Sequence, residues 1–317
     1  MRRFRGPRRP LDEATRERRR LRIRRRGRRA YIRSVYSLPS LATLGNAICG
    51  FGAMYVSTLD SRTQSNTHDQ WTLFLVHHNF VAAAYLIFAA MIFDAVDGRL
   101  ARFARHTTDF GGQLDSLADA VSFGTAPAFL SLQVFHWYHT DLESPMVARL
   151  VWAVGALYVA CALIRLARFN VSNEHGEQHH YSLLGLPSPG AAGAVAAFVL
   201  MQQDLWERSA NHPVLVSISE ACIWVLPLIV LGTGLLMVSA IRYPHLVNRY
   251  LSGRRSIERL LVVLIGLLLL VVAHRYTLGI GTLAYAVWGV VGLIAYRMRQ
   301  RRLKLGLQAA EPLVSKS

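Results

Sequence analysis

The 317-residue sequence has few acidic residues and few cysteines. It contains 19 Asp and Glu against 36 Lys and Arg, and only 17% of its residues are charged. With 52% apolar residues and a mean hydropathy of +0.26, it is too apolar for an ordinary soluble enzyme. The cysteines, Cys49, Cys161 and Cys222, stand singly in apolar segments, so we expect neither a zinc site nor a disulfide framework.

Three further patterns are missing from the sequence. No Ser, Cys or His stands in a nucleophile–base arrangement, which argues against a covalent enzyme intermediate. No internal repeat is found, which argues against a transporter built from inverted halves. The basic N-terminus lacks interleaved aromatic residues, so nucleic acid is not an expected partner.

Long apolar segments, by contrast, are plentiful. Several approach or reach the length that crosses a hydrocarbon core of roughly 30 Å. The clearest covers residues 259–276. The sequence therefore predicts an all-α integral membrane protein with about eight transmembrane helices, six in a core and two in an added C-terminal pair. The expected spans are 38–58, 79–98, 113–136, 148–168, 187–203, 214–241, 257–273 and 277–296.

The positive charge is concentrated at the N-terminus, where residues 1–33 hold 16 arginines. Basic loops then alternate with loops that carry few basic residues, and basic loops remain on the cytoplasmic side of a membrane. Both termini and the aspartates described next are therefore expected to face the cytoplasm of a cell membrane. The predicted divisions are a disordered Arg-rich tail (1–33), a transmembrane domain (34–245), a C-terminal transmembrane pair (246–297) and a second cytoplasmic tail (298–317).

Four aspartates stand beside apolar segments in residues 94–119. Asp94 and Asp97 are three residues apart, and Asp115 and Asp119 are four apart, so each pair lies on one face of a helix. Carboxylates near a membrane are costly unless they are paired, solvated or metal-bound. Bringing four together favours a bound divalent cation, and oxygen ligands favour Mg²⁺ or Mn²⁺.

Residues 94–119 match every position of one spaced sequence motif. It consists of Asp94, Asp97-Gly98, Ala101-Arg102, Gly111, Asp115 and Asp119. Here the chain closely resembles the CDP-alcohol phosphatidyltransferase family of membrane enzymes, which displace CMP from a CDP-linked lipid or alcohol by attack of a hydroxyl. The resemblance implies homodimers and a site with two divalent metal ions.

The resemblance also implies roles for individual residues. Asp94, Asp97 and Asp115 correspond to metal ligands, and Asp119 completes the metal site and takes the proton from the attacking hydroxyl. The CDP-lipid would be bound by the remaining pattern residues and one residue of the first helix, namely Gly98, Ala101, Arg102, Gly111 and Thr43.

Four other segments resemble the phosphatidylserine synthase branch of that family. They cover residues 37–53, 115–128, 165–171 and 185–193. The implied substrates are CDP-diacylglycerol and L-serine, within the lipid bilayer. A serine site needs cation donors for the substrate carboxylate, and Arg165 and Arg168 are placed to hold that carboxylate or a donor phosphate.

Other interpretations use the same residues differently. The same chemistry could use glycerol phosphate, inositol phosphate or choline as the acceptor. A transporter could line its pathway with acidic residues. A prenyl transferase would need two well-separated acidic clusters, whereas this chain has one compact block.

Overall fold

The computed structural model describes residues 40–59, 70–104, 109–139, 144–174, 185–209, 212–241 and 272–289, with single positions between 264 and 298. The predicted N-terminal tail lies outside the described residues, as do nearly all of the C-terminal tail and most of the span at 257–273. No role predicted for those segments is tested.

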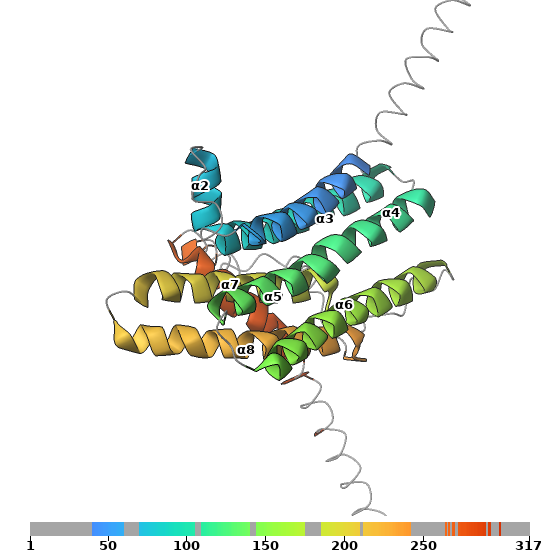
Figure 1. Cartoon of the computed structure of the whole chain (residues 1–317). Helices are drawn as coiled ribbons and strands as arrows, with labels where there is room; N and C mark the ends of the chain where they lie inside the picture. Colours follow the sequence, from blue (N-terminus) through green and yellow to red (C-terminus); the bar gives the residue numbers. More distant parts are fainter. Residues whose placement is uncertain are drawn as a thin grey trace, which may run out of the picture.

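The described chain is helical, and its described residues include no strand, which confirms the all-α prediction. Figure 1 shows the helices gathered into one bundle. In chain order they are a helix over residues 40–57, α2 (Gln70–His77), α3 (Asn79–Ala104), α4 (Asp109–Asp119), the π-helix η1 (Ala120–Thr125), α5 (Ala126–Tyr138), α6 (Pro145–Glu174), α7 (Ser188–Ser209), α8 (Pro213–Val238) and helical residues within 274–289.

Three described helices are long and apolar enough to cross a membrane. They cover Asn79–Leu100, Pro145–Val171 and Pro213–Val238, and correspond to the second, fourth and sixth expected spans. Each exceeds the roughly 20 residues that a helical crossing requires. The full count of eight stays a prediction.

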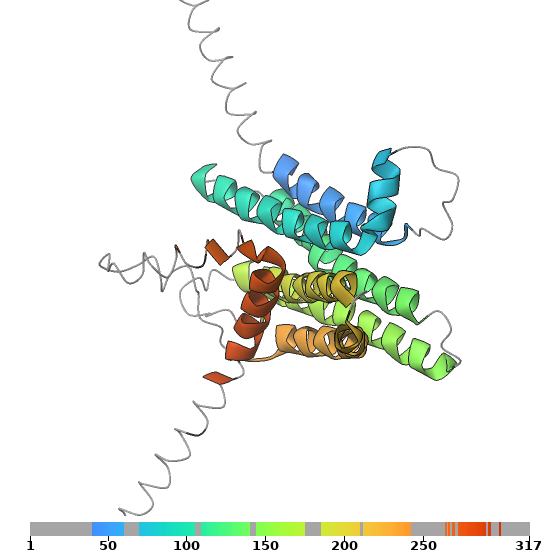
Figure 2. The ribbon, with the colours of Figure 1, turned by 90° about the vertical axis from the view of Figure 1, so that its left-hand side faces the viewer.

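Helix α7 occupies the centre of the bundle, although its sequence is a weak transmembrane candidate. Every residue from 191 to 200 is buried, because α3 and α8 pack against α7 and further helices close its remaining sides. Figures 1 and 2 show α7 between these neighbours. Its core-facing residues are largely alanine and glycine, which allow helices to approach closely within a membrane.

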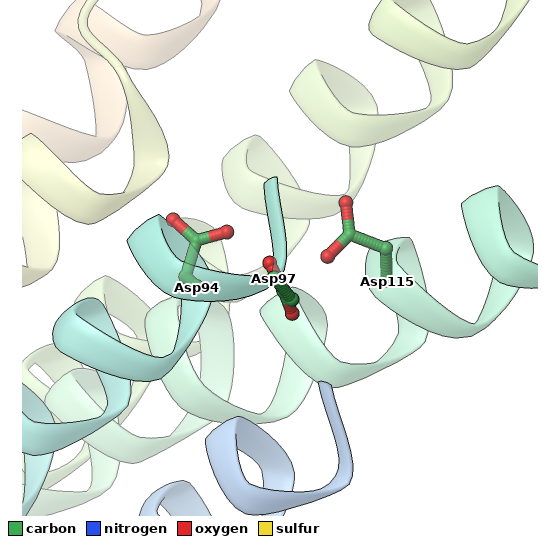
Figure 3. Close-up of side chains that lie close together, drawn as sticks. All are labelled: Asp94, Asp97 and Asp115. Carbon is green, nitrogen blue, oxygen red and sulfur yellow. The ribbon is translucent and has the colours of Figure 1, made fainter. Parts of the chain in front are cut away.

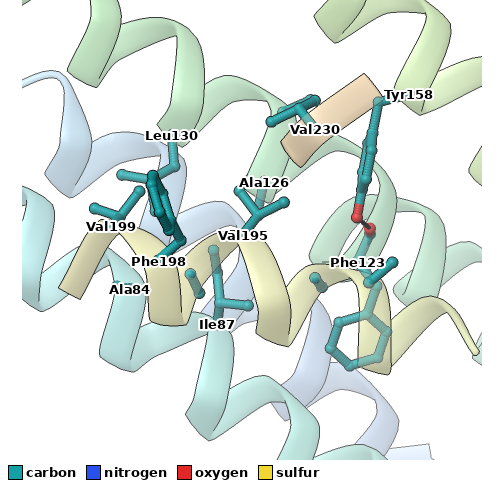
Figure 4. Packing of buried hydrophobic residues seen from close by; sticks show 14 of the residues in the cluster. Ala84, Ile87, Phe123, Ala126, Leu130, Tyr158, Val195, Phe198, Val199 and Val230 are labelled. Atoms are coloured by element: carbon teal, nitrogen blue, oxygen red, sulfur yellow. Dashed lines mark hydrogen bonds between the residues drawn. The ribbon is translucent and has the colours of Figure 1, made fainter. Parts of the chain in front are cut away.

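Helices α4, η1 and α5 form one continuous rod with a change of helical register. The cause is Pro127, which lacks an N–H and clashes with the carbonyl of Phe123, four residues earlier. The Ala126 N–H bonds instead to the Val121 carbonyl, which is the wider π-helical pattern. The Phe123 carbonyl is satisfied by another helix, because the buried Tyr158 hydroxyl on α6 donates to it at 3.1 Å (Figure 4).

Replacing Tyr158 with phenylalanine is expected to destabilise the protein. The Phe123 carbonyl would stay buried without its donor, at a cost of about 1–3 kcal/mol. Thermal unfolding in detergent should show a lower midpoint for Tyr158→Phe than for the wild type. The matched control is Tyr55→Phe, which removes the hydroxyl of an exposed tyrosine. Equal midpoints for the two variants would contradict this account of the π-helix.

The segment before α7 is attached to the end of α8. Gly185 has a φ of +86°, and a Cβ there would lie 2.2 Å from the Met237 carbonyl oxygen, so only glycine fits. The Gly185 N–H donates to the Ile241 carbonyl at 2.8 Å, and the Leu186 N–H donates to the Leu236 carbonyl at 2.9 Å. These bonds fix the start of α7 beside the end of α8.

Candidate active site and metal centre

The candidate site lies at one end of the bundle. The C-terminal part of α3 and α4 meet there and carry the four aspartates. The start of the helix at 40–57 packs against this region through hydrogen bonds to α4 and η1. The last turns of α6 and the start of α7 complete this end of the bundle. Residues far apart in the sequence therefore converge on the aspartates.

Three of the four aspartates form a close cluster. Asp94, Asp97 and Asp115 each offer a carboxylate oxygen, and these oxygens lie within 4.8 Å of one another. Figure 3 shows the three carboxylates turned toward a shared space, two from α3 and one from α4. Asp97 is buried, and Asp94 and Asp115 are half-buried. The spacing in the sequence and the approach of the two helices thus place three negative groups together.

The cluster fits a divalent metal ion. Asp97 Oδ2 and Asp115 Oδ1 are buried and have no hydrogen-bond partner among the residues that the structure describes. Buried carboxylate oxygens without partners are costly, and a cation would supply the missing interaction. Opposite ligands of an octahedral Mg²⁺ lie about 4.2 Å apart, so the observed separations suit a shared ion after small side-chain shifts. The described ligands are all oxygen, which favours Mg²⁺ or Mn²⁺ over zinc.

Asp119 lies next to the cluster and is held differently. It interacts electrostatically with the three clustered aspartates, but its carboxylate does not belong to the close group that Asp94, Asp97 and Asp115 form. Its Oδ1 accepts a hydrogen bond of 3.0 Å from Asn46 Nδ2 on the helix at 40–57. Asp119 is therefore oriented by an uncharged amide, which leaves its other oxygen available for a different task.

Asn46 is itself fixed by a close helix crossing. Its backbone carbonyl accepts a hydrogen bond of 2.8 Å from Ser122 Oγ in η1. A Cβ at Gly50 would lie 2.5 Å from Ser122 Oγ and 2.6 Å from Ser122 Cα, so the crossing requires glycine at that position. Ser122 and Asn46 are fully buried. The π-helical segment thus positions the residue that orients Asp119.

The predicted CDP-lipid residues occupy different parts of this end. The buried Thr43 hydroxyl hydrogen-bonds to Asp97, and the Gly98 backbone bonds to the same carboxylate. A Cβ at Gly98 would meet no described atom within 4 Å, so the described residues leave the space beside it unfilled. Gly111 lies in the first turn of α4. Ala101 and Arg102 are in α3, but their side chains lie outside the described part of the structure.

Arg165 and Arg168 lie on α6 at the same end of the bundle as the aspartates. Arg165 is half-buried and interacts electrostatically with Asp119. Its Nε donates to the Leu186 carbonyl at 2.7 Å, and its Nη1 lies 3.4 Å from Ser188 Oγ. Arg168 is exposed on the next turn. Two of the Arg165 nitrogens are thus committed to the start of α7, which fixes the direction of the guanidinium.

A side-chain hydrogen bond joins α4 to α6. Ser116 Oγ on α4 donates to Asn170 Oδ1 on α6 at 3.0 Å. Ser116 directly follows Asp115, and Asn170 lies two residues beyond Arg168. This bond holds the acidic helix against the helix that carries both arginines.

Asn46 is a site residue that the sequence analysis missed. The signal was present, because Thr43, Asn46 and Gly50 are spaced by three and four residues and so share one face of a helix. A buried amide on the same face as a predicted substrate residue is unusual in an apolar helix. The structure turns this face toward Asp97, Asp119 and η1.

The chain is similar to known proteins over much of its length. Residues 36–230 match the family model described as CDP-alcohol phosphatidyltransferase. A protein of Helicobacter pylori (strain 26695) is 34% identical over 214 residues, which cover 68% of this chain and 80% of the relative. A Methanocaldococcus jannaschii protein is 30% identical over 66% of this chain and 83% of its own length. A Bacillus subtilis protein is 27% identical over 66% of this chain and 90% of its own length. Each is named CDP-diacylglycerol–serine O-phosphatidyltransferase.

Proposed function

Because the chain belongs to the CDP-alcohol phosphatidyltransferase family, we propose that it transfers a phosphatidyl group from CDP-diacylglycerol to the hydroxyl of L-serine, giving phosphatidylserine and CMP. The names of its relatives support the donor and the acceptor. The proposal rests above all on one observation, the cluster of Asp94, Asp97 and Asp115, in which two buried carboxylate oxygens have no hydrogen-bond partner among the described residues.

The three clustered aspartates would hold the divalent metal that this family generally uses. A bound Mg²⁺ or Mn²⁺ would supply Lewis-acid chemistry that neutralises the donor diphosphate. Asp94 and Asp97 come from α3 and Asp115 from α4, so the donor would bind where these two helices meet. No described atom fills the space beside Gly98, where the donor would approach the backbone. We propose two ions, with Asp119 completing the ligand set.

Asp119 would act as the general base. The serine hydroxyl oxygen attacks the β-phosphorus, the bond between that phosphorus and the CMP oxygen breaks, and the hydroxyl proton passes to Asp119. Asn46 holds Asp119 Oδ1, so the carboxylate is fixed before the hydroxyl arrives. A direct displacement is consistent with the absence of a nucleophile–base pattern in the sequence.

Arg165 would bind the carboxylate of serine. Its guanidinium is fixed by Leu186 and Ser188 and lies close enough to Asp119 for an electrostatic interaction. A carboxylate held there would place the serine hydroxyl near the proposed base. Arginine suits this role because its planar fork can bond the protein and a carboxylate at the same time. Arg168, exposed one turn further on, would add positive charge on the same helix.

Replacing Arg165 with lysine is expected to raise the KM for serine by about 10- to 100-fold, the range of one lost charge-assisted hydrogen bond. Lysine keeps the charge but cannot bond Leu186, Ser188 and the substrate in the same geometry. The assay is initial-rate CMP release at varied serine. Arg149→Lys, an exposed arginine at the other end of α6, is the matched control. An unchanged serine KM in Arg165→Lys would remove Arg165 from the acceptor site.

The setting proposed for this reaction is the cytoplasmic membrane. Six core spans and a C-terminal pair, with the aspartates and both termini facing the cytoplasm, would expose the site to soluble serine. The lipid tails of the donor would enter sideways between helices. A homodimer is part of the proposal through the family resemblance.

The acceptor is tested by a panel of alcohols. Purified protein with CDP-diacylglycerol and Mg²⁺ or Mn²⁺ should release CMP faster when serine is added. Glycerol phosphate, inositol phosphate and choline should give no comparable stimulation. Stimulation by one of these three in place of serine would keep the reaction class and overturn the acceptor.

A further inference from the structure

The helical residues 274–289 lie beyond the part of the chain that matches the family model, and they pack across α7. Glycines mark the contacts. A Cβ at Gly279 would lie 3.4 Å from the Ala197 carbonyl oxygen. A Cβ at Gly193 would lie 3.7 Å from Thr282 Cγ2. The contacts run in opposite order along the two helices, so the segment crosses α7 in an antiparallel sense; Figure 2 shows it in red.

A polar cluster fixes this segment at the far end of α7. The buried Asp204 accepts a hydrogen bond of 2.5 Å from the Tyr276 hydroxyl and pairs with Arg275 at 3.1 Å. Arg275 also pairs with Glu207 at 2.9 Å. A buried carboxylate with several charged and hydrogen-bonded partners favours one register of the two helices over others. The segment is thus anchored at a point remote from the aspartate cluster.

The same register brings Tyr285 to the candidate site. From Asp204 back to Gly190, α7 spans about 21 Å. There, Tyr285 Cε1 lies 3.5 Å from the position that a Cβ at Gly190 would take. The same Cβ position at Gly190 would lie 3.7 Å from Leu186 Cδ1, and the Leu186 carbonyl accepts the hydrogen bond of Arg165. Tyr285 and Arg165 are close enough to interact electrostatically.

We propose that Tyr285 is a positioning residue of the acceptor site, brought beside Arg165 by the register that the Asp204 cluster sets. This inference rests on the proposed function. A phenol can both donate and accept hydrogen bonds, so Tyr285 can restrain the Arg165 guanidinium in the direction that holds the substrate carboxylate. The absence of a side chain at Gly190 lets the ring come this close. A segment beyond the family match would thereby contribute to acceptor selection.

The test is the variant Tyr285→Phe, which keeps the ring against Gly190 and removes only the hydroxyl. We expect the KM for serine to rise about three- to tenfold, the range of one neutral hydrogen bond. The kcat and the KM for CDP-diacylglycerol should stay within about twofold of the wild type, a split that a general packing defect would not produce. Trp288→Phe, at an exposed aromatic residue of the same segment, is the control.

A double variant separates action through Arg165 from an independent effect. If Tyr285 acts through Arg165, Arg165→Lys combined with Tyr285→Phe should raise the serine KM no further than Arg165→Lys alone. An unchanged serine KM in Tyr285→Phe, or equal shifts in the KM of both substrates, would overturn this proposal and leave the proposed function standing. A wild type whose CMP release does not respond to serine would overturn both.

Discussion

Replacing Asp115 with asparagine is expected to lower the rate of CMP release by about 10³-fold or more. The variant keeps the shape of the side chain and removes one charged ligand from the cluster with Asp94 and Asp97. Metal-assisted charge stabilisation is worth several kcal/mol, and each 1.36 kcal/mol is a factor of ten in rate. The measurement is kcat/KM for purified protein in detergent at saturating Mg²⁺ or Mn²⁺.

Metal binding should fall together with activity in Asp115→Asn. Titration with Mn²⁺, followed by its paramagnetic resonance signal, should give tight binding for the wild type and weak binding for this variant. Glu220→Gln, which neutralises an exposed acid on α8, is the control and should behave like the wild type. An Asp115→Asn protein that keeps more than about a tenth of wild-type kcat/KM would show that the cluster is not needed for catalysis.

Replacing Asp119 with asparagine should abolish turnover and leave CDP-diacylglycerol binding measurable. The loss is expected to be about 10²- to 10⁴-fold in kcat, the range of a general base. Asparagine keeps an oxygen that can accept the Asn46 hydrogen bond, so the side chain can stay in place while it loses its ability to take a proton.

Two measurements separate the roles of Asp119. Equilibrium binding of labelled CDP-diacylglycerol reports the donor site, and single-turnover CMP release reports the chemical step. An Asp119→Asn variant that binds the donor normally and does not turn over would support the role of Asp119 as the general base. Unchanged turnover would contradict the assigned role, and loss of donor binding would make Asp119 chiefly a ligand for metal or donor.

The aspartate pattern could be predicted from the sequence because its spacing is local. Helical periodicity places Asp94 with Asp97, and Asp115 with Asp119, on shared faces before any fold is known. The resemblance to the family, which rested on the same pattern, is confirmed by the match over residues 36–230. The division of the four into a close set of three and a fourth held by Asn46 depends on the angle between α3 and α4, which spacing does not give.

Features that depend on tertiary packing could not be predicted from the sequence. By hydropathy, α7 is a weak candidate for a membrane helix. Its small residues nevertheless let other helices pack closely around it, so it lies at the centre of the bundle. The buried Phe123 carbonyl is satisfied by Tyr158, which lies on another helix and is 35 residues further along the chain. Tyr285 approaches Arg165 only through the register of two helices far apart in the chain.

The central claim is a metal-dependent transfer of the phosphatidyl group to serine, and its most direct measurement follows the label of radioactive serine into lipid. Purified protein with CDP-diacylglycerol and Mg²⁺ or Mn²⁺ should form labelled phosphatidylserine and CMP in equal amounts. Chelation of the metal should stop both, and its return should restore both. Release of CMP with no label in the lipid, or transfer that continues in the chelator, would contradict the account.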